Sequence, residues 1–481
     1  MNNKTNQISD LQGSKTAELL QSLSKEEFKR FGLFIRSPYF NKSKKLEKLY
    51  DYFKIKYNSG KNPEISKAEL WQYVNPGEKY DETNARKSIS NFTKLAEEFL
   101  IITQLDNDEA AKLNLLSQIS SNRKFKKTFD AAVNNAEDLY KNMNYQSDER
   151  YFNKLTTERL KFIFRGSTAK MPEEQLSVIS KAIDLYYISR KLLLFYDILN
   201  LGLHYKKSIT FDMWSFDEIV RFIENNKDEI MKGHPGIYGD YLSVLMMLYP
   251  DEKDRYMNLK NFVASAENLL RIEKQRFHIY LYNHTVYLIN SGRSEFIKET
   301  FEVTKIIDDE KYPVWEFFAF HIYYLNAVTN SVNSGEKVWA AEFIEKHRNR
   351  INENIRQETF SLANAIYYHL TGNYNEALKF IVNVDYPNYN YYLKAKSILI
   401  TIYFERGDVE GVLGTCDSLR KFLSRNELIP DRVLNSYTKF AICAAKLIEP
   451  DNLLHIYEAK KILDEDHTVA NREWLLSKAH S

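Results

Sequence analysis

The chain has 481 residues, which exceeds the size at which a single hydrophobic core keeps growing, so we expect several domains or an extended array of repeats. Aromatic residues make up 14% of the chain and supply enough apolar side chain to exclude an intrinsically disordered protein. Only 15 Gly and 10 Pro interrupt it, which favours long helices and few tight turns. The net charge of +2 indicates no particular class of partner.

The first residues, "MNNKTNQISDLQGSKTAELL", lack the apolar core of a secretory signal. No run in the chain approaches the roughly 18 apolar residues of a membrane span. Two cysteines in a chain of this length exclude a disulfide framework. We therefore expect a soluble, cytoplasmic protein that has no membrane partner.

Residues 1–105 are expected to form a small helical N-terminal module. Ser24 and Glu27 have the spacing of a capping box ahead of "KEEFKRFGLFI". Asp81 is suited to cap a further helix that begins at "ETNARKSI". A change of pattern at "QLDNDEAAK" places the end of this module near residue 105, and the longer helices of residues 106–481 follow.

Part of the module, "ISKAELWQYVNPGEKYDETNARKSISNFTKLAEEFL", resembles the helix-turn-helix of winged-helix regulators. The resemblance implies that six residues of the second helix face nucleic acid: Asn84, Arg86, Lys87, Ser90, Asn91 and Lys94. The turn is long, however, and "IITQLDNDEAAK" offers one poor strand where a wing belongs. The net charge of residues 1–100 is a mild +5. We therefore favour the alternative, a helical docking or capping module.

Residues 106–481 show helical periodicity almost throughout. In "DERYFNKLTTERLKFIFRG" the apolar residues fall on one stripe, as in an amphipathic helix. In "SVISKAIDLYYISRKLLLFYDIL" the apolar face covers more than half of the circumference, so this helix must be contacted from two sides. No convincing alternating run bounded by turn residues predicts a strand. The sequence therefore predicts an all-α fold.

The stretch "IYYHLTGNYNEALKF", which begins at Ile366, predicts two helices that meet at Gly372. Glycine suits this position because it adopts a positive φ without strain at the end of a helix. Ala377, in the second helix, is small enough for two antiparallel helices to approach closely where they cross. Tyr368 then has room to fill the space beside it.

The same pattern occurs one period downstream. "LITIYFERGDVEGVLGTC" holds Tyr403, Gly407 and Val412, each 35 residues after its counterpart. Gly292 and Gly335 stand in similar helix–Gly–helix settings upstream, at looser spacings. This pattern resembles the tetratricopeptide repeat, a helix pair of 34 residues that stacks into a superhelix. The resemblance implies an α-α superhelix, a solenoid of degenerate repeats, over residues 106–481.

In tetratricopeptide proteins the first helix of each pair lines a concave groove. Carried onto the two clearest repeats, the resemblance implies a partner-binding groove made by Leu362, Ile366, His369, Ser397, Thr401 and Phe404. Ile366 and Thr401 stand where the repeats that clamp an acidic peptide end have asparagine. Capture of such an acidic tail is therefore not expected.

No motif predicts catalysis, a metal or a cofactor. His278 and His284 are six residues apart and so lie on different faces of a helix, whereas a zinc site needs ligands on one face. Cys416 and Cys443 are expected to be buried small side chains. "GSKT" lacks the earlier glycine and the strand of a phosphate-binding loop. We expect a non-enzymatic protein without a cofactor.

Two functions remain open after this reading of the sequence. The favoured hypothesis is a scaffold that binds a protein or peptide partner through the surface of its helical repeats. The alternative is a nucleic-acid-binding regulator that uses residues 1–105 for contact and the repeats for sensing or dimerisation.

Overall fold

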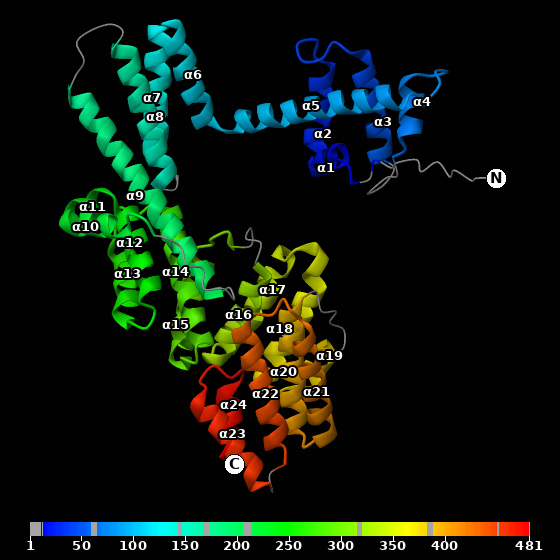
Figure 1. The fold of residues 1–481 in the computed structure, drawn as a ribbon, viewed down its shortest axis with the longest axis vertical. Coiled ribbons are helices and arrows are strands. Elements are labelled where there is room, and N and C mark those ends of the chain that lie inside the picture. The colour runs from blue at the N-terminus through cyan, green and yellow to red at the C-terminus, as the bar shows by residue number, and fades with distance from the viewer. Residues whose placement is uncertain are drawn as a thin grey trace. The chain divides into compact units, whose positions relative to one another are not determined.

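The structure, a computed structural model, describes residues 11, 13–58, 65–142, 147–166, 173–204, 213–314, 320–381, 388–449 and 452–480. In these residues it contains 24 α-helices, three short 3₁₀ turns and no strand (Figure 1). The predicted all-α fold is therefore confirmed, and consecutive helices pack against each other. No helix among these residues combines the length and the apolar character that crossing a membrane requires.

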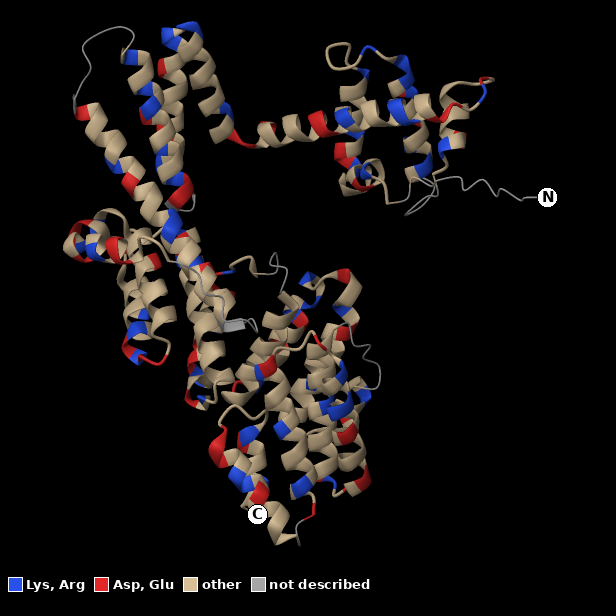
Figure 2. Ribbon diagram, viewed as in Figure 1, with Lys and Arg blue, Asp and Glu red and all other residues tan. Residues whose placement is uncertain are grey.

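The chain divides into two compact units. Unit 1 consists of residues 1–142 and 156–175, and unit 2 consists of residues 143–155 and 176–481. Lys and Arg are interspersed with Asp and Glu along the helices of each unit, so neither sign of charge dominates (Figure 2). Two helices, α8 (Ser147–Gly166) and α9 (Glu173–His204), contribute residues to both units.

Unit 1 begins with five helices around an aromatic core: α1 (Lys15–Ser22), α2 (Lys25–Arg36), α3 (Lys44–Asn58), α4 (Lys67–Val74) and α5 (Glu82–Asn107). Phe31, Phe53 and Phe92 are buried, and the ring of Phe92 lies 5.5 Å from that of Phe31 and 5.0 Å from that of Phe53. The capping box of Ser24 and Glu27 forms at the start of α2 as predicted.

After α5 the chain turns at once into a helical hairpin. Asp108 caps α6 (Glu109–Arg123), and α7 (Lys126–Asn142) returns along it. The division expected near residue 105 falls in the last turn of α5. The division into an N-terminal module of residues 1–105 and a repeat array of residues 106–481 therefore stays a prediction.

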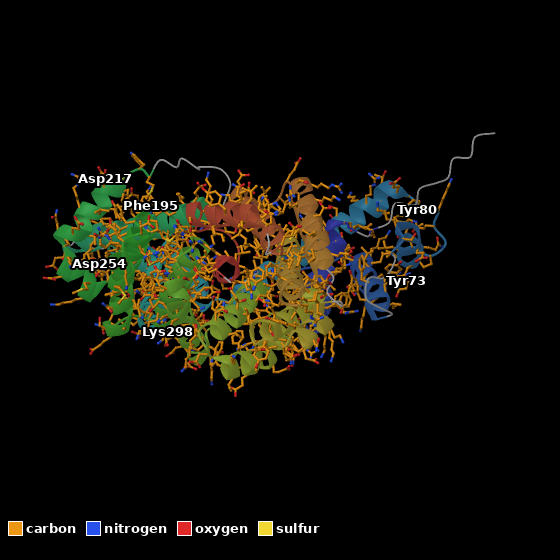
Figure 3. All side chains as sticks on the ribbon, turned by 90° about the horizontal axis from the view of Figure 1, so that it is seen from below. Tyr73, Tyr80, Phe195, Asp217, Asp254 and Lys298 are labelled. Atoms are coloured by element: carbon orange, nitrogen blue, oxygen red, sulfur yellow. The ribbon has the colours of Figure 1, made fainter. Side chains whose placement is uncertain are left out.

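Unit 2 continues after α9 with α10 (Phe216–Asn225), α11 (Lys227–Gly233), α12 (Pro235–Leu248) and α13 (Lys253–Ser265). α12 is buried along almost its whole length, and Phe195 of α9 is buried in the same core (Figure 3). Gly239 allows Phe277 to approach the helix closely, because a Cβ at Gly239 would lie 2.3 Å from the Phe277 ring.

Five consecutive helix pairs and a final helix complete unit 2. The pairs are α14 (Arg271–Asn290) with α15 (Ile297–Asp309), α16 (Phe320–Asn333) with α17 (Lys337–His347), α18 (Arg356–Leu370) with α19 (Tyr374–Ile381), α20 (Tyr389–Glu405) with α21 (Val409–Arg425), and α22 (Asp431–Leu447) with α23 (Leu453–Glu465). The final helix is α24 (Arg472–Ala479).

Glycines of positive φ end the first helix of four pairs. Gly292, Gly335, Gly372 and Gly407 have φ values of 90°, 91°, 83° and 67°. The predicted helix–Gly–helix turns are therefore confirmed at all four positions. In each turn the backbone bonds that close the helix depend on this conformation, as in the bond from the Asn373 N–H to the Tyr368 carbonyl at 2.8 Å.

Ala377 lies where the sequence analysis expected it, at the seam between α18 and α19. Its side chain is fully buried, and the two helices pack closely. The ring of Tyr368 on α18 stacks on that of Phe380 on α19, with centroids 5.6 Å apart. A small residue at the crossing and an aromatic pair beside it thus hold this helix pair together.

Candidate functional site

The six residues expected to line a groove lie on α18 and α20, but they are not a free surface. Leu362 and Ile366 are buried in the core of unit 2, and Ser397 and Thr401 are buried on α20. The Thr401 hydroxyl donates to the Ser397 carbonyl at 2.6 Å, so it is satisfied within its own helix.

The C-terminal segment covers this part of the first helices. The Asn471 amide donates to the Ser397 hydroxyl at 2.7 Å. Trp474 of α24 meets Phe404 edge to face at 5.1 Å and donates its indole N–H to Glu405. The expected groove residues therefore contact the chain itself, and their use for a partner stays a prediction.

His369, the remaining residue of the expected groove, has an uncharged imidazole at neutral pH. Burial lowers the pKa of His369 to about 4, although the nearby Glu405 carboxylate opposes the shift. Glu405 is itself held by Lys478 and Trp474 of α24, and these hydrogen bonds lower the pKa of its carboxyl against the effect of burial.

A pocket of about 920 Å³ lies earlier in the array, on α14 and α16. The start of α20 and the loop between α21 and α22 close its other side. Its lining is mostly apolar and includes Ile279, Val286, Val314, Phe320, Ile322, Leu428 and Val433. Ile322 and Leu428 are exposed, so the pocket opens to solvent.

The two helices contribute matching residues to this pocket. Ile279 and Asn283 stand thirteen and nine residues before Gly292, and Ile322 and Asn326 stand at the same distances before Gly335. The sequences "IYLYN" and "IYYLN" carry these pairs. The repeat thus places an isoleucine and, one turn later, a half-buried asparagine at equivalent positions on successive first helices.

The sequence analysis did not find these residues, although a signal was present. The offset between "IYLYN" and "IYYLN" is 43 residues, the same as that between Gly292 and Gly335. Tyr282 and Val286 also stand ten and six residues before their glycine, as Leu362 and Ile366 do before Gly372. If the positions of the expected groove residues, counted back from their glycine, had been applied to Gly292, they would have pointed to residues of α14.

Polar atoms in this pocket have unused hydrogen-bonding capacity. The Tyr323 hydroxyl is buried and has no hydrogen-bond partner. The Asn326 carbonyl accepts from the Lys394 ammonium at 3.5 Å. No carboxylate in the described residues pairs with Lys394, and burial lowers the pKa of its ammonium to about 8. The pocket therefore combines an apolar lining with a few donors and acceptors, as ligand sites do.

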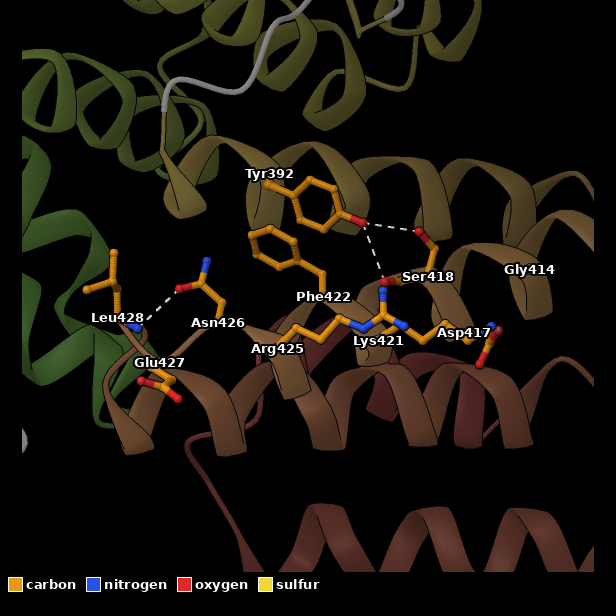
Figure 4. A pocket seen from close by; sticks show the side chains of 10 residues that line it. All are labelled: Tyr392, Gly414, Asp417, Ser418, Lys421, Phe422, Arg425, Asn426, Glu427 and Leu428. Carbon is orange, nitrogen blue, oxygen red and sulfur yellow. Dashed lines mark hydrogen bonds and ion pairs between the residues drawn. The ribbon is translucent and has the colours of Figure 1, made fainter.

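A second concavity of about 810 Å³ lies along α21 (Figure 4). The Tyr392 ring stacks on Phe422 with centroids 3.9 Å apart, and its hydroxyl lies 3.1 Å from the Ser418 hydroxyl. Asp417, Lys421 and Arg425 add mixed charges along its side. Its best-placed polar groups already bond to each other, so we regard the pocket on α14 and α16 as the stronger candidate.

The six residues proposed for nucleic-acid contact all lie exposed on α5. Arg86, Ser90 and Lys94 share one side, where they line a concavity of about 490 Å³ with Lys15 and Lys67. The other three, Asn84, Lys87 and Asn91, are outside that concavity. Arg86 pairs with Glu82 on its own helix, and Lys15 pairs with Glu97. Nucleic-acid contact by these residues stays a prediction.

The segment in which the winged-helix comparison required a wing is helical. Residues 101–112 form the end of α5 and the start of α6, with Asp108 between them. The one poor strand considered there is therefore absent from the structure. Ile102 of this segment packs against the core of the five N-terminal helices instead.

Of the histidines and cysteines weighed for chemistry in the sequence analysis, His278 and His284 lie on α14, Cys416 lies on α21 and Cys443 lies on α22. His284 is buried, and this burial lowers its pKa to about 4. His278 lies 3.3 Å from the Tyr312 hydroxyl. Cys416 and Cys443 are free and buried as expected, and burial raises the pKa of their thiols to about 12 and about 11. Among the described residues, no cluster of three or more His, Cys, Asp or Glu has a geometry suited to a metal ion.

The sequence matches no protein-family model, and neither the curated proteins nor the solved structures contain a match to it. The class that the structure defines is therefore an all-α protein of consecutively packed helix pairs.

Proposed function

We propose that the protein is a non-enzymatic scaffold of the tetratricopeptide-like type, and that it binds an extended apolar segment of a protein partner in the pocket on α14 and α16. The observation that carries this proposal is the repeated pair of isoleucine and asparagine. Ile279 with Asn283, and Ile322 with Asn326, line one pocket from equivalent positions of two successive repeats.

The turns of the array support its assignment to the tetratricopeptide-like type. Four successive pairs end their first helix at a glycine of positive φ, and the last spacing, between Gly372 and Gly407, is 35 residues. That spacing is close to the 34 residues of the tetratricopeptide repeat. Helix pairs that each contact mainly their neighbours stack into a right-handed superhelix in that family, and we extend this geometry to unit 2.

The chemistry of the pocket indicates the kind of partner. Isoleucines at its wall favour an apolar side chain, because removal of apolar surface from water is the main driving force of such contacts. A side-chain amide has two donor hydrogens and an oxygen with two lone pairs, so Asn283 and Asn326 keep capacity for the N–H and C=O groups of an extended backbone beside their contacts with the Tyr196 and Tyr282 hydroxyls. The partner segment is therefore apolar and extended in this proposal.

The test compares two double variants of the full chain. Asn283→Ala with Asn326→Ala removes the two amides, whereas Asn258→Ala with Asn261→Ala removes two exposed amides on α13, outside the pocket. Affinity purification from the native host, followed by mass spectrometry, identifies the partners of each. We expect the principal partner to be lost from the first variant and kept by the second.

The size of the loss is measured as the change in affinity for a peptide that carries the bound segment. Two lost hydrogen bonds of about 1 kcal/mol each weaken binding by roughly tenfold or more. A partner set and an affinity that do not change in the first double variant would refute the proposal. Loss of binding in both variants would place the contact outside the pocket.

A second candidate function, nucleic-acid contact through α5, rests on the concavity that Arg86 and Lys94 share with Lys15 and Lys67. Contacts of Lys and Arg with phosphate release counterions, so such binding weakens steeply as salt rises. Titration of the full chain with duplex DNA at increasing salt tests it. Tight binding that Arg86→Ala with Lys94→Ala abolishes would make this function the first choice.

A further inference from the structure

The longest helix in the described residues, α9, carries an apolar stripe that the described residues of unit 2 leave about half exposed. Leu176, Ile183, Tyr187, Leu194 and Leu201 are each between 40% and 51% exposed. They follow one another at steps of 7, 4, 7 and 7 residues. At 3.6 residues per turn these steps keep all five within about 20° of one line along the helix.

The stripe is not required for packing within unit 2. The opposite side of α9 is buried by residues that include Leu185, Ile188, Leu192 and Tyr196, and these belong to the main core. The helix is thus apolar on two sides, as its sequence indicated, and the structure accounts for only one of them. In the heptad register of a helix pair, five of the eight a and d positions from Leu176 to Leu201 are apolar, and the other three are Ser180, Arg190 and Asp197.

The order of residues in the stripe is symmetric about the midpoint between Ile188 and Ser189. Four of the five stripe residues form two pairs whose members lie at equal distances on either side of this midpoint. Leu176 corresponds to Leu201, and Ile183 corresponds to Leu194. Two antiparallel copies of α9 related by a two-fold axis at this midpoint would therefore bring leucine against leucine and isoleucine against leucine.

Three polar residues beside the stripe, Ser180, Arg190 and Asp197, fit the same symmetry. Tyr187 corresponds to Arg190, which is exposed even though it bonds to Asp148 at 2.7 Å. A guanidinium over a tyrosine ring is a favourable contact. Ser180 corresponds to Asp197, and a hydroxyl donates readily to a carboxylate. No layer of the pair would place two like charges together.

We propose that a second copy of this chain covers the stripe, so that α9 and its counterpart form an antiparallel pair of helices. The stripe from Leu176 to Leu201 is about 38 Å long, which gives more than three heptads of contact. An isologous contact of this kind closes on itself and yields a dimer, not a filament. This inference does not depend on the proposed pocket, because none of the stripe residues except Leu201 lines it.

The experiment measures the mass of the full chain by light scattering at concentrations from low to high micromolar. We expect twice the mass of the chain for the unchanged protein. In the proposed pair, Ile183 of each copy faces Leu194 of the other. Ile183→Glu alone, or Leu194→Lys alone, therefore places a charge against an apolar side chain at both of these contacts. Each single variant should reduce the mass to that of one chain. Val178→Glu is the matched control, since Val178 is 41% exposed on the same helix but points half a turn away. It should leave the dimer intact.

The combined variant Ile183→Glu with Leu194→Lys tests the antiparallel register. In this register every introduced carboxylate meets an introduced ammonium of the other copy, so the dimer should return. In a parallel pair like charges would meet like charges, and the mass would stay that of one chain. Circular dichroism of each variant confirms that it is folded. A single-chain mass for the unchanged protein, a dimer that survives both single changes, or no recovery in the combined variant would each overturn the proposal.

Discussion

Replacement of Gly292 by alanine tests the contact between the C-terminal segment and the array. Gly292 ends α14 with φ of 90°, and a Cβ at this position would lie 2.3 Å from the carbonyl oxygen of His467. Gly335 and Gly372 have nearly the same φ, 91° and 83°, but a Cβ at either would meet nothing within 4 Å. The three substitutions therefore share their backbone strain and differ in one contact.

The expected losses of folding stability follow from two effects, the strain of a positive φ and the steric clash. An alanine in the left-handed region costs about 1–2 kcal/mol, and we expect this loss of stability for Gly335→Ala and Gly372→Ala. Gly292→Ala adds a clash with backbone, which cannot rotate away, and overpacking of this kind costs about 1–3 kcal/mol more. The expected difference between Gly292→Ala and its two controls is thus roughly 1–3 kcal/mol.

Urea unfolding of the full chain measures the stabilities, and hydrogen exchange locates the effect. In Gly292→Ala the amides of α24 and of the loop that contains His467 should exchange faster, because the clash displaces that segment. In the two control variants they should exchange as in the parent. Equal stabilities for all three variants, with unchanged exchange in α24, would show that the C-terminal segment does not pack on this turn.

Three further outcomes are expected. Ala377→Arg buries a charge in a fully closed seam and should cost about 3 kcal/mol or more, and a melting temperature equal to that of the parent would refute the repeat seam. Burial lowers the pKa of His284 and His369 to about 4 from 6.5, so between these values the unfolded chain binds protons that the folded chain does not. The two histidines should therefore make stability fall as pH drops through this window, against the opposite contribution of Asp240, whose pKa burial raises to about 7. A stability that rises steadily from pH 6.5 to 4 would contradict this. Cys416 and Cys443 should react with a thiol reagent only after unfolding, and rapid reaction of the native protein would contradict their burial.

The helix pairs could be predicted from the sequence because their signals are local. A glycine between two apolar-periodic segments predicts a turn without any information from distant residues. The structure has a positive φ at each such glycine, namely Gly292, Gly335, Gly372 and Gly407. Ala377 was assigned on similar grounds, since a small residue at a helix crossing has a direct steric purpose.

The candidate site depends on contacts between distant residues, and these were not accessible from periodicity. Nothing local indicates that Asn471 bonds to Ser397 or that Trp474 packs on Phe404. The predicted groove residues lie on α18 and α20, where Ser397 and Phe404 contact the C-terminal segment, and their use as a groove stays a prediction. Asn283 and Asn326 can be recognised as equivalent only after the upstream repeats have been aligned. The glycines of those repeats are unevenly spaced, so the sequence alone did not suggest that alignment.

Photo-crosslinking tests the central proposal, that a partner segment binds in the pocket on α14 and α16, most directly. A photoreactive residue replaces Ile322, which is exposed at the pocket, or, as a control, Val338, which is 74% exposed on α17 and does not line the pocket. Irradiation of the full chain with its principal partner should give a covalent product from position 322 and none from position 338. A product from position 338 alone would contradict the proposed site.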